Sequence, residues 1–209
     1  QRGISVSYAD MRSLEAVENA IQPNTRMLWL ESPTNPLTYV LDLPALAALG
    51  RKRDLLTVVD NTFATPYLQN PLEMGVDVVV HSVTKYLGGH SDILGGALVF
   101  NRDDLWEPLW DQQAIGGAVL SPFESWLLLR GMKTLAVRMR AHCENAATIA
   151  HYLSQHPKVE RVLYPGLPDH PQHALAKQLM RGFGGMIAVY LKTDRAGVDR
   201  FCRSLRLFN

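Results

Sequence analysis

The stretch VDVVVHSVTKYLGG, residues 76–89, combines a run of β-branched apolar residues with a polar segment and a pair of glycines. Short runs that are mostly apolar and β-branched, such as Val76–Val80, are typical of strands that are covered on both faces of a sheet. Ser82, Thr84 and Lys85 would then lie just beyond the end of a buried strand. In α/β sheets ligands bind beyond the carboxyl ends of the strands, so this stretch predicts both a fold class and the place of a site.

The segments around this stretch repeat the pattern of short apolar run and helix. Further strands are expected at Ile4–Tyr8, Met27–Glu31, Leu55–Val59 and Ala97–Phe100, and helices at Ser13–Ile21 and Leu43–Arg53. Because helices separate several of the runs, the pattern predicts an α/β fold whose sheet is mostly parallel, with right-handed crossovers and flanking helices.

The second half of the chain predicts a smaller α/β unit. A long helical pattern covers residues 122–156, and Gly131 is expected to break it. It is followed by expected strands at Val159–Leu163 and Met186–Leu191 and expected helices at His173–Met180 and Ala196–Leu205. We therefore expect a large domain over residues 1–131 and the start of a smaller C-terminal domain over residues 132–209.

Composition narrows the possible partners. The chain has 209 residues, 47% hydrophobic and 20% charged, with a formal net charge of +1. That balance is typical of a globular protein and gives no electrostatic reason to expect nucleic acid or an anionic membrane as partner. Its two cysteines, Cys143 and Cys202, lack the spacing of a metal site, and we expect no metal and a reducing, cytoplasmic setting.

The polar residues after the third apolar run suit a phosphate and an aldehyde. Ser82 and Thr84 carry hydroxyls that can donate hydrogen bonds to a phosphate, and the glycines that follow permit close approach. Lys85 would be held near that phosphate, where a neutral amine could attack an aldehyde to form a Schiff base. Taken alone this is weak evidence, because a lysine after a strand is most often a solvated surface residue.

Asp60 strengthens this interpretation. It ends the apolar run Leu55–Val59, where an ionised carboxylate needs a partner. A protonated pyridine nitrogen would be such a partner, although an aspartate there can also cap the turn formed by residues 61–63. One strand–helix–strand crossover separates Asp60 from Lys85, so both could reach one ligand. A carboxylate and a Schiff-base lysine are the pair that pyridoxal 5′-phosphate (PLP) requires.

Several spaced segments share a resemblance to one enzyme family. They are ESPTNP (31–36), VDNTFATP (59–66), SVTKYLGGHSD (82–92), LRGMKTL (129–135), YPGL (164–167), HPQH (170–173) and GFGGM (182–186). In this order they resemble the transsulfuration, or Cys/Met metabolism, PLP-dependent enzymes. The resemblance covers essentially the whole chain.

The resemblance implies a fold-type-I PLP-dependent transferase with a large cofactor domain and a smaller C-terminal domain. By position, Lys85 would be the Schiff-base lysine and Asp60 the partner of the pyridinium nitrogen. Ser82 and Thr84 would bind the phosphate, and Asn35 would lie near the cofactor's 3′-oxygen and the substrate carboxylate. Family members are longer at both ends, so we expect this chain to be incomplete, and they assemble as tetramers built from dimers.

The resemblance also implies the activity. We expect elimination or replacement at the γ carbon of a sulfur amino acid, of the cystathionine γ-lyase or γ-synthase type. Methionine γ-lyase and cystathionine β-lyase remain alternatives within the family. A truncated relative that keeps the scaffold as a non-catalytic interaction module is an alternative of another class.

Overall fold

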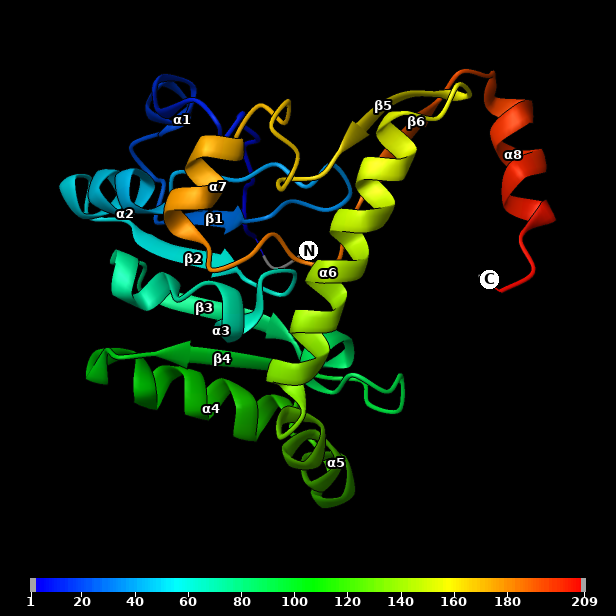
Figure 1. The fold of residues 1–209 in the computed structure, drawn as a ribbon. Coiled ribbons are helices and arrows are strands. Elements are labelled where there is room, and N and C mark those ends of the chain that lie inside the picture. The colour runs from blue at the N-terminus through cyan, green and yellow to red at the C-terminus, as the bar shows by residue number, and fades with distance from the viewer. Residues whose placement is uncertain (1–2, 208–209) are drawn as a thin grey trace.

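The computed structural model describes residues 3–207, and its centre is a four-stranded sheet (Figure 1). The strands are β1 (Met27–Glu31), β2 (Leu56–Asp60), β3 (Val78–Ser82) and β4 (Gly96–Phe100), and they are neighbours in that order. The first three strands run parallel, and β4 pairs antiparallel with β3. The expected mostly parallel sheet is confirmed.

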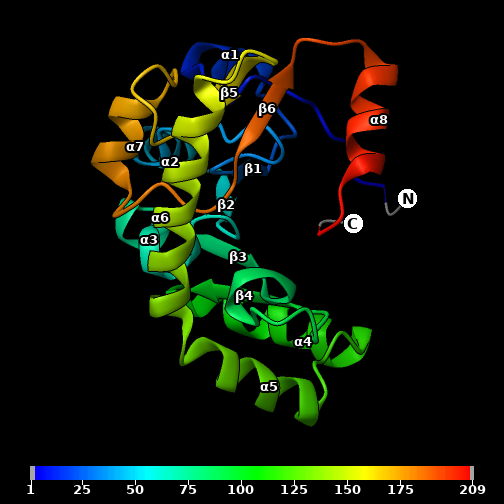
Figure 2. The same cartoon turned by 45° about the vertical axis from the view of Figure 1, so that its right-hand side comes forward.

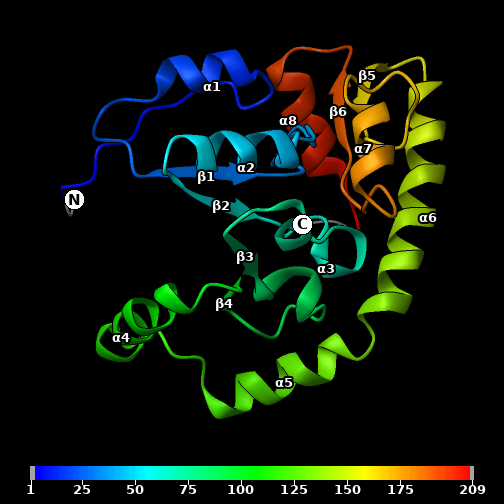
Figure 3. The same ribbon diagram turned by 90° about the vertical axis from the view of Figure 1, so that its left-hand side faces the viewer.

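Two capped helices lie at the β1–β2 end of the sheet: the second covers one face of these strands, and the first packs on the second (Figure 3). The hydroxyl of Ser13 accepts a hydrogen bond from the Ala16 N–H and starts α1 (Leu14–Ala20). The Asp42 carboxylate does the same for α2 (Leu43–Lys52) at the Ala45 N–H, 3.1 Å away. Such caps satisfy backbone donors that have no partner inside the helix.

The main core lies between α2 and this face of the sheet. Its buried members include Leu28, Leu30, Leu43, Leu46, Ala47, Val59 and Val79. Leu30, Leu46 and Val59 are at most 1% exposed. Burial of each such side chain contributes about 1.5–3 kcal/mol to folding, so this layer holds α2 against β1 and β2.

Short helical segments connect the strands, and two longer helices follow the sheet. α3 (Thr65–Leu68) and η1 (Pro71–Met74) lie between β2 and β3, and η2 (Val83–Leu87) follows β3. η3 (Asp103–Leu105) then leads into α4 (Trp106–Gly116) and α5 (Pro122–Met132). Figure 3 shows α4 and α5 beyond β4, at the end of the sheet opposite α1.

A second, smaller sheet lies at the far end of a long helix. α6 (Leu135–Ser154) leads to β5 (Val159–Leu163), which pairs antiparallel with β6 (Ala188–Leu191). α7 (His173–Leu179) lies between these two strands, and α8 (Arg195–Ser204) follows them. Figure 2 shows α8 apart from the main sheet, on the far side of β6. The expected elements of this half are present, and the division at residue 131 stays a prediction.

Two details differ from the sequence-based expectations. Residues 4–8 form no strand, because no strand of the described chain pairs with them, and Ile4 and Tyr8 are 80% and 95% exposed. Gly131 does not break the helical pattern; it lies in the last turn of α5, and the break falls between Met132 and Leu135.

Candidate active site

The three parallel strands end at one edge of the sheet and bring polar residues together there. Glu31 lies opposite Asp60 in the register of β1 and β2, and Asp60 lies opposite Val80 in β3. Paired residues share a face of a sheet, and side chains alternate along each strand. Asp60 and Ser82, two residues beyond Val80, therefore lie on the same face, as the interpretation of one shared ligand requires.

The carboxylate of Asp60 is held in part by its own turn. One oxygen accepts a hydrogen bond from the Thr62 N–H at 2.9 Å, so the turn-capping role that the sequence left open is real. The other oxygen has no hydrogen-bond partner among the described residues. The cap fixes the carboxylate while leaving one oxygen able to accept a further hydrogen bond, so capping and ligand binding are compatible.

Thr62 is a residue that the sequence argument missed. Its hydroxyl accepts a hydrogen bond from the Ser82 N–H at 2.8 Å, which ties the end of β2 to the end of β3. The signal was present in the sequence, since a hydroxyl two residues after a strand-ending aspartate can bridge to the neighbouring strand. Thr62 therefore fixes the spacing between the Asp60 and Ser82 sides of the site.

The two predicted phosphate-binding hydroxyls differ in their surroundings. The Thr84 hydroxyl accepts from the Gly95 N–H at 3.0 Å and donates to the Gly95 carbonyl at 3.4 Å. Within the described chain the Ser82 hydroxyl makes no side-chain hydrogen bond, and its residue is half-buried. Ser82 is thus the freer donor, whereas Thr84 also closes the loop between η2 and β4.

Lys85 is the third residue of η2, the turn that begins immediately after Ser82. Its φ and ψ of −91° and −125° interrupt the helical geometry of this single π-type turn. The turn is closed by hydrogen bonds from the Gly88 N–H to the Val83 carbonyl and from the Gly89 N–H to the Lys85 carbonyl, at 2.9 and 2.8 Å. Lys85 itself is exposed, so the turn supports its backbone and leaves its side chain accessible.

Asn35 lies in the loop after β1, at the same edge. It is exposed, and its backbone N–H donates a hydrogen bond to the Glu31 carboxyl group. Burial raises the pKa of Glu31, the hydrogen bond from Asn35 acts in the opposite direction, and the negative charge of Asp60 raises the pKa further. The loop is braced by the buried hydroxyl of Ser32, which accepts from the Leu41 N–H at 3.1 Å.

A histidine lies behind the same edge. His81 is 4% exposed and its ring Nδ1 has no hydrogen-bond partner in the described chain. Burial lowers the pKa of His81, although the nearby Asp60 charge acts against this shift.

In the described residues no group of three or more histidine, cysteine, aspartate or glutamate side chains could hold a metal ion, and no helix is long and apolar enough to span a bilayer.

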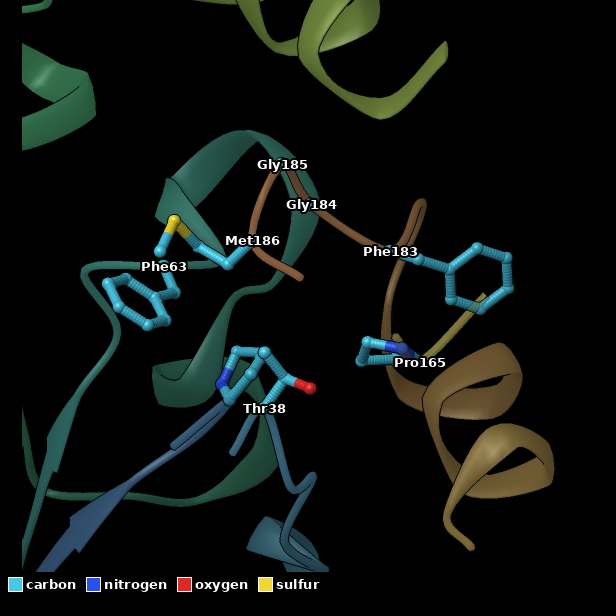
Figure 4. A pocket seen from close by; sticks show the side chains of 8 residues that line it. Thr38, Phe63, Pro165, Phe183, Gly184, Gly185 and Met186 are labelled. Atoms are coloured by element: carbon cyan, nitrogen blue, oxygen red, sulfur yellow. The ribbon is translucent and has the colours of Figure 1, made fainter. Parts of the chain in front are cut away.

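The segment GFGGM reaches the site from the second half of the chain. Figure 4 shows Gly184, Gly185 and Met186 passing close to Phe63, the third residue after Asp60. Together with Thr38, Pro33, Pro165 and Phe183 they line a small hollow of about 10 Å³. The turn after Asp60 therefore packs against residues that lie more than 100 positions further along the chain.

Comparison with known proteins identifies the family. The family model for the Cys/Met metabolism PLP-dependent enzymes matches residues 1–209. A probable cystathionine γ-synthase of Herpetosiphon aurantiacus is 53% identical over 192 residues, 92% of this chain and 60% of that protein. A cystathionine β-lyase of Coxiella burnetii is 50% identical over 207 residues, 99% of this chain and 54% of that protein.

A solved structure gives the same result. The crystal structure of cystathionine γ-lyase from Lactobacillus plantarum, complexed with L-serine, superposes with a TM-score of 0.87 at 52% identity, over 88% of this chain and 49% of that one. The chain belongs to the Cys/Met metabolism PLP-dependent enzyme family, as the resemblance implied, and the cofactor of that family is PLP. It spans about half the length of the relatives that it matches.

The residues at the sheet edge suit this cofactor chemically. A carboxylate oxygen of Asp60 is available to accept from a protonated ring nitrogen, and the Ser82 hydroxyl on the same face can donate to a phosphate. Lys85 supplies an accessible amine three residues beyond Ser82. These donors and acceptors match three of the polar groups of PLP, namely its ring nitrogen, its phosphate and its aldehyde.

Proposed function

We propose that the protein is a PLP-dependent enzyme that eliminates or replaces the γ substituent of a sulfur amino acid, of the cystathionine γ-lyase or γ-synthase type. The observation that carries the proposal is that Asp60 and Lys85, at neighbouring strand ends, are both present in a chain of this family. Relatives named cystathionine γ-synthase and γ-lyase support the substrate class.

Each residue has a distinct task in this proposal. PLP, when bound, supplies an electron sink for the negative charge that develops at the substrate Cα. Lys85 would hold the cofactor through its Nζ and, once the substrate amino group has taken its place, would accept the Cα proton as general base. The free oxygen of Asp60 would accept a hydrogen bond from the ring nitrogen and keep it protonated. The Thr62 N–H fixes that carboxylate from the other side.

The remaining residues bind and orient. The Ser82 hydroxyl would donate to the phosphate, and so would the Thr84 hydroxyl two residues further on, which also accepts from the Gly95 N–H. Asn35 would orient the cofactor's 3′-oxygen and the substrate carboxylate. Because these other residues would hold the cofactor, Lys85 could release it and then act as general base while the cofactor stays in place.

Replacement of Lys85 tests this proposal. We expect Lys85→Ala to abolish both the visible absorbance of the lysine-linked cofactor and turnover, because no other residue supplies the amine. Lys177→Ala, an exposed lysine on α7, is the matched control and should leave both unchanged. Normal turnover in the Lys85 variant would refute the assignment, and a wild-type protein without the absorbance would favour a non-catalytic scaffold.

A substrate panel separates the activities within the family. Release of cysteine from cystathionine indicates γ cleavage, release of homocysteine indicates β cleavage, and condensation of an acylated homoserine with cysteine indicates a synthase. Cleavage of methionine itself would favour a methionine γ-lyase. We expect the γ reactions to be faster than the β reaction; the opposite order would overturn the γ assignment.

We further propose that the protein is a cytoplasmic homo-oligomer, a tetramer built from dimers. Support comes from four large aromatic side chains on α4 and α5, Trp106, Trp110, Phe123 and Trp126, which are 55–67% exposed. Large exposed apolar patches mark interfaces in soluble proteins. Both cysteines are free, in keeping with a reducing compartment. A monomer in light scattering of the PLP-loaded protein would contradict this assembly.

A further inference from the structure

The turn that carries Lys85 is bonded to the first turns of α6 by one side chain, Arg138. Its Nη1 donates to the carbonyl of Tyr86 at 2.7 Å, and its Nη2 donates to the carbonyl of Gly131 at 2.9 Å. Its Nε donates to the Thr134 hydroxyl at 3.0 Å. One guanidinium therefore joins the residue after Lys85 to the junction between α5 and α6.

The partners of this guanidinium are all neutral oxygens. No carboxylate of residues 3–207 lies within ion-pair distance of Arg138. Partial burial lowers the pKa of Arg138, yet an arginine stays charged at neutral pH. A planar fork of donors can hold two carbonyls at fixed positions at once, whereas a lysine ammonium cannot reproduce that geometry. The arrangement is therefore specific to arginine.

The glycines around the turn make this close approach possible. A Cβ at Gly89, whose φ is +80°, would collide with the Arg138 guanidinium. A Cβ at Gly131 would collide with the carbonyl oxygen of Gly88. The backbone of the Lys85 turn thus lies directly against the end of α5 and the side chain of Arg138.

The next turn of α6 holds the same residue from another side. The ring of His142, four residues after Arg138, packs edge-on against the Tyr86 ring, with centroids 5.1 Å apart. Desolvation lowers the pKa of His142, and the Arg138 charge lowers it further, so this ring packs as the neutral form near pH 7. Residues on two successive turns of α6 therefore contact Tyr86, the immediate neighbour of Lys85.

We propose that Arg138 is a positioning residue for Lys85, fixing the backbone of the 83–89 turn so that the amine meets the cofactor and the substrate Cα at one set position. This inference rests on the proposed function, in which Lys85 holds PLP and accepts the Cα proton. Nothing in it requires Arg138 to touch cofactor or substrate; it acts through the Tyr86 carbonyl.

The test compares Arg138→Ala with Arg140→Ala in the PLP-loaded protein. Arg140 lies on the same helix and is exposed, and its one hydrogen bond is a long one of 3.4 Å to the Tyr67 hydroxyl. Because a misplacement of about 1 Å can cost roughly 100-fold in rate, we expect kcat of Arg138→Ala to fall by about that factor, with KM changing less. Arg140→Ala should stay within about twofold, as exposed substitutions usually do.

Two spectroscopic readouts separate positioning from mere stability. In Arg138→Ala the pH dependence of the cofactor's visible absorbance should shift, and the amides of residues 83–89 should exchange hydrogen faster, at a temperature where both variants are fully folded. A variant that melts earlier but keeps its kcat and its absorbance profile would overturn the proposal. If Arg138→Ala does not fold, Arg138→Lys decides, and an unchanged kcat and profile there would overturn it too.

The outcomes also separate this inference from the proposed function. If Lys85→Ala loses the absorbance while the Arg138 variants behave as wild type, only the role of Arg138 fails. If Lys85→Ala keeps the absorbance and turnover, the assignment of Lys85 fails first, and the positioning role fails with it.

Discussion

The core face of the β1–β2 end and the helices beyond β4 differ in how far their large apolar side chains are buried. At the β1–β2 end, α2 buries Leu46 completely, and Leu30 and Val59 beneath it are at most 1% exposed. Beyond β4, the four aromatic side chains of α4 and α5 are 55–67% exposed, and no residue of α4 is buried. They stack on one another in pairs, Trp106 on Trp110 and Phe123 on Trp126, with ring centroids 5.8 and 6.0 Å apart.

The core at the β1–β2 end is formed within this chain, whereas the exposed side chains of α4 and α5 are available for contact with another molecule. The strand ends that carry Glu31 and Asp60 rest on a core made entirely from this chain. The aromatic side chains of α4 and α5 have no such cover among the described residues, which is the basis for proposing a second copy as their partner. Variants at the two ends should therefore fail in different ways.

The largest expected effect is on activity, at the covered end. Asp60→Asn keeps an oxygen for the Thr62 N–H but loses the charge that would hold the ring nitrogen protonated. We expect kcat to fall on the order of 1,000-fold, within the range of lost proton-transfer assistance, while the melting temperature stays near that of the wild type. The control is Asp54→Asn, an exposed position with a φ of 53° that asparagine also tolerates. A rate near that of the wild type would remove Asp60 from the mechanism.

The next effect is on stability and contrasts the two ends directly. Leu46→Ala removes a side chain that is 0% exposed and should cost about 2–5 kcal/mol of unfolding free energy. Leu129→Ala, on α5 at 63% exposure, should cost about 0.5 kcal/mol or less in dilute protein. Urea titration measures both. Equal losses would show that α5 is packed as tightly as the β1–β2 core, and the comparison would fail.

The smallest effect depends on pH and concerns Asp77, just before β3. Burial by itself would raise the pKa of Asp77, but hydrogen bonds from the Thr57 N–H and hydroxyl and from Arg102 outweigh it, so the pKa is lowered. A lowered pKa stabilises the fold above the unfolded value of 3.8, and that gain is lost as the pH falls through the folded pKa.

Asp77→Asn should accordingly destabilise the protein at pH 7 and lose most of its effect once the pH falls below the folded pKa of Asp77. Thermal unfolding of both proteins at pH 7 and at a pH well below 3.8 measures the difference. Asp104→Asn, whose exposed carboxylate pairs with the same Arg102, serves as the control and should change less. A constant difference between wild type and Asp77→Asn at both pH values would contradict the expectation.

The sequence predicted the parts of the molecule that local patterns control. Apolar runs such as Val78–Val80 and helical spacing such as that of Leu43–Arg53 act over a few positions, and a strand and a helix lie there as expected. Convergence of Asp60 and Ser82 also followed from the sequence, because parallel strands end at a common edge. The assignment of Lys85, Asp60, Ser82, Thr84 and Asn35 to PLP stays a prediction.

Features that depend on distant parts of the chain could not be predicted from local sequence patterns. The apolar residues 4–8 resemble a strand locally but find no pairing strand in the described chain. Trp106, Trp110 and Trp126 are large apolar side chains of the kind that is often buried, yet they are 55–59% exposed in the described chain. Arg138 lies 53 positions after Lys85, and no local pattern indicates that its guanidinium reaches the Tyr86 carbonyl.

The length of α6 gives its contacts a mechanical meaning. At about 1.5 Å per residue its 20 residues form a rod roughly 30 Å long. One end carries Arg138 and His142 against Tyr86, and further along Ala146 and Ala150 pack with Val159 and Val162 of β5. Because rigid helices can couple the contacts at their two ends, we expect a tilt of the small sheet to displace the turn that carries Lys85.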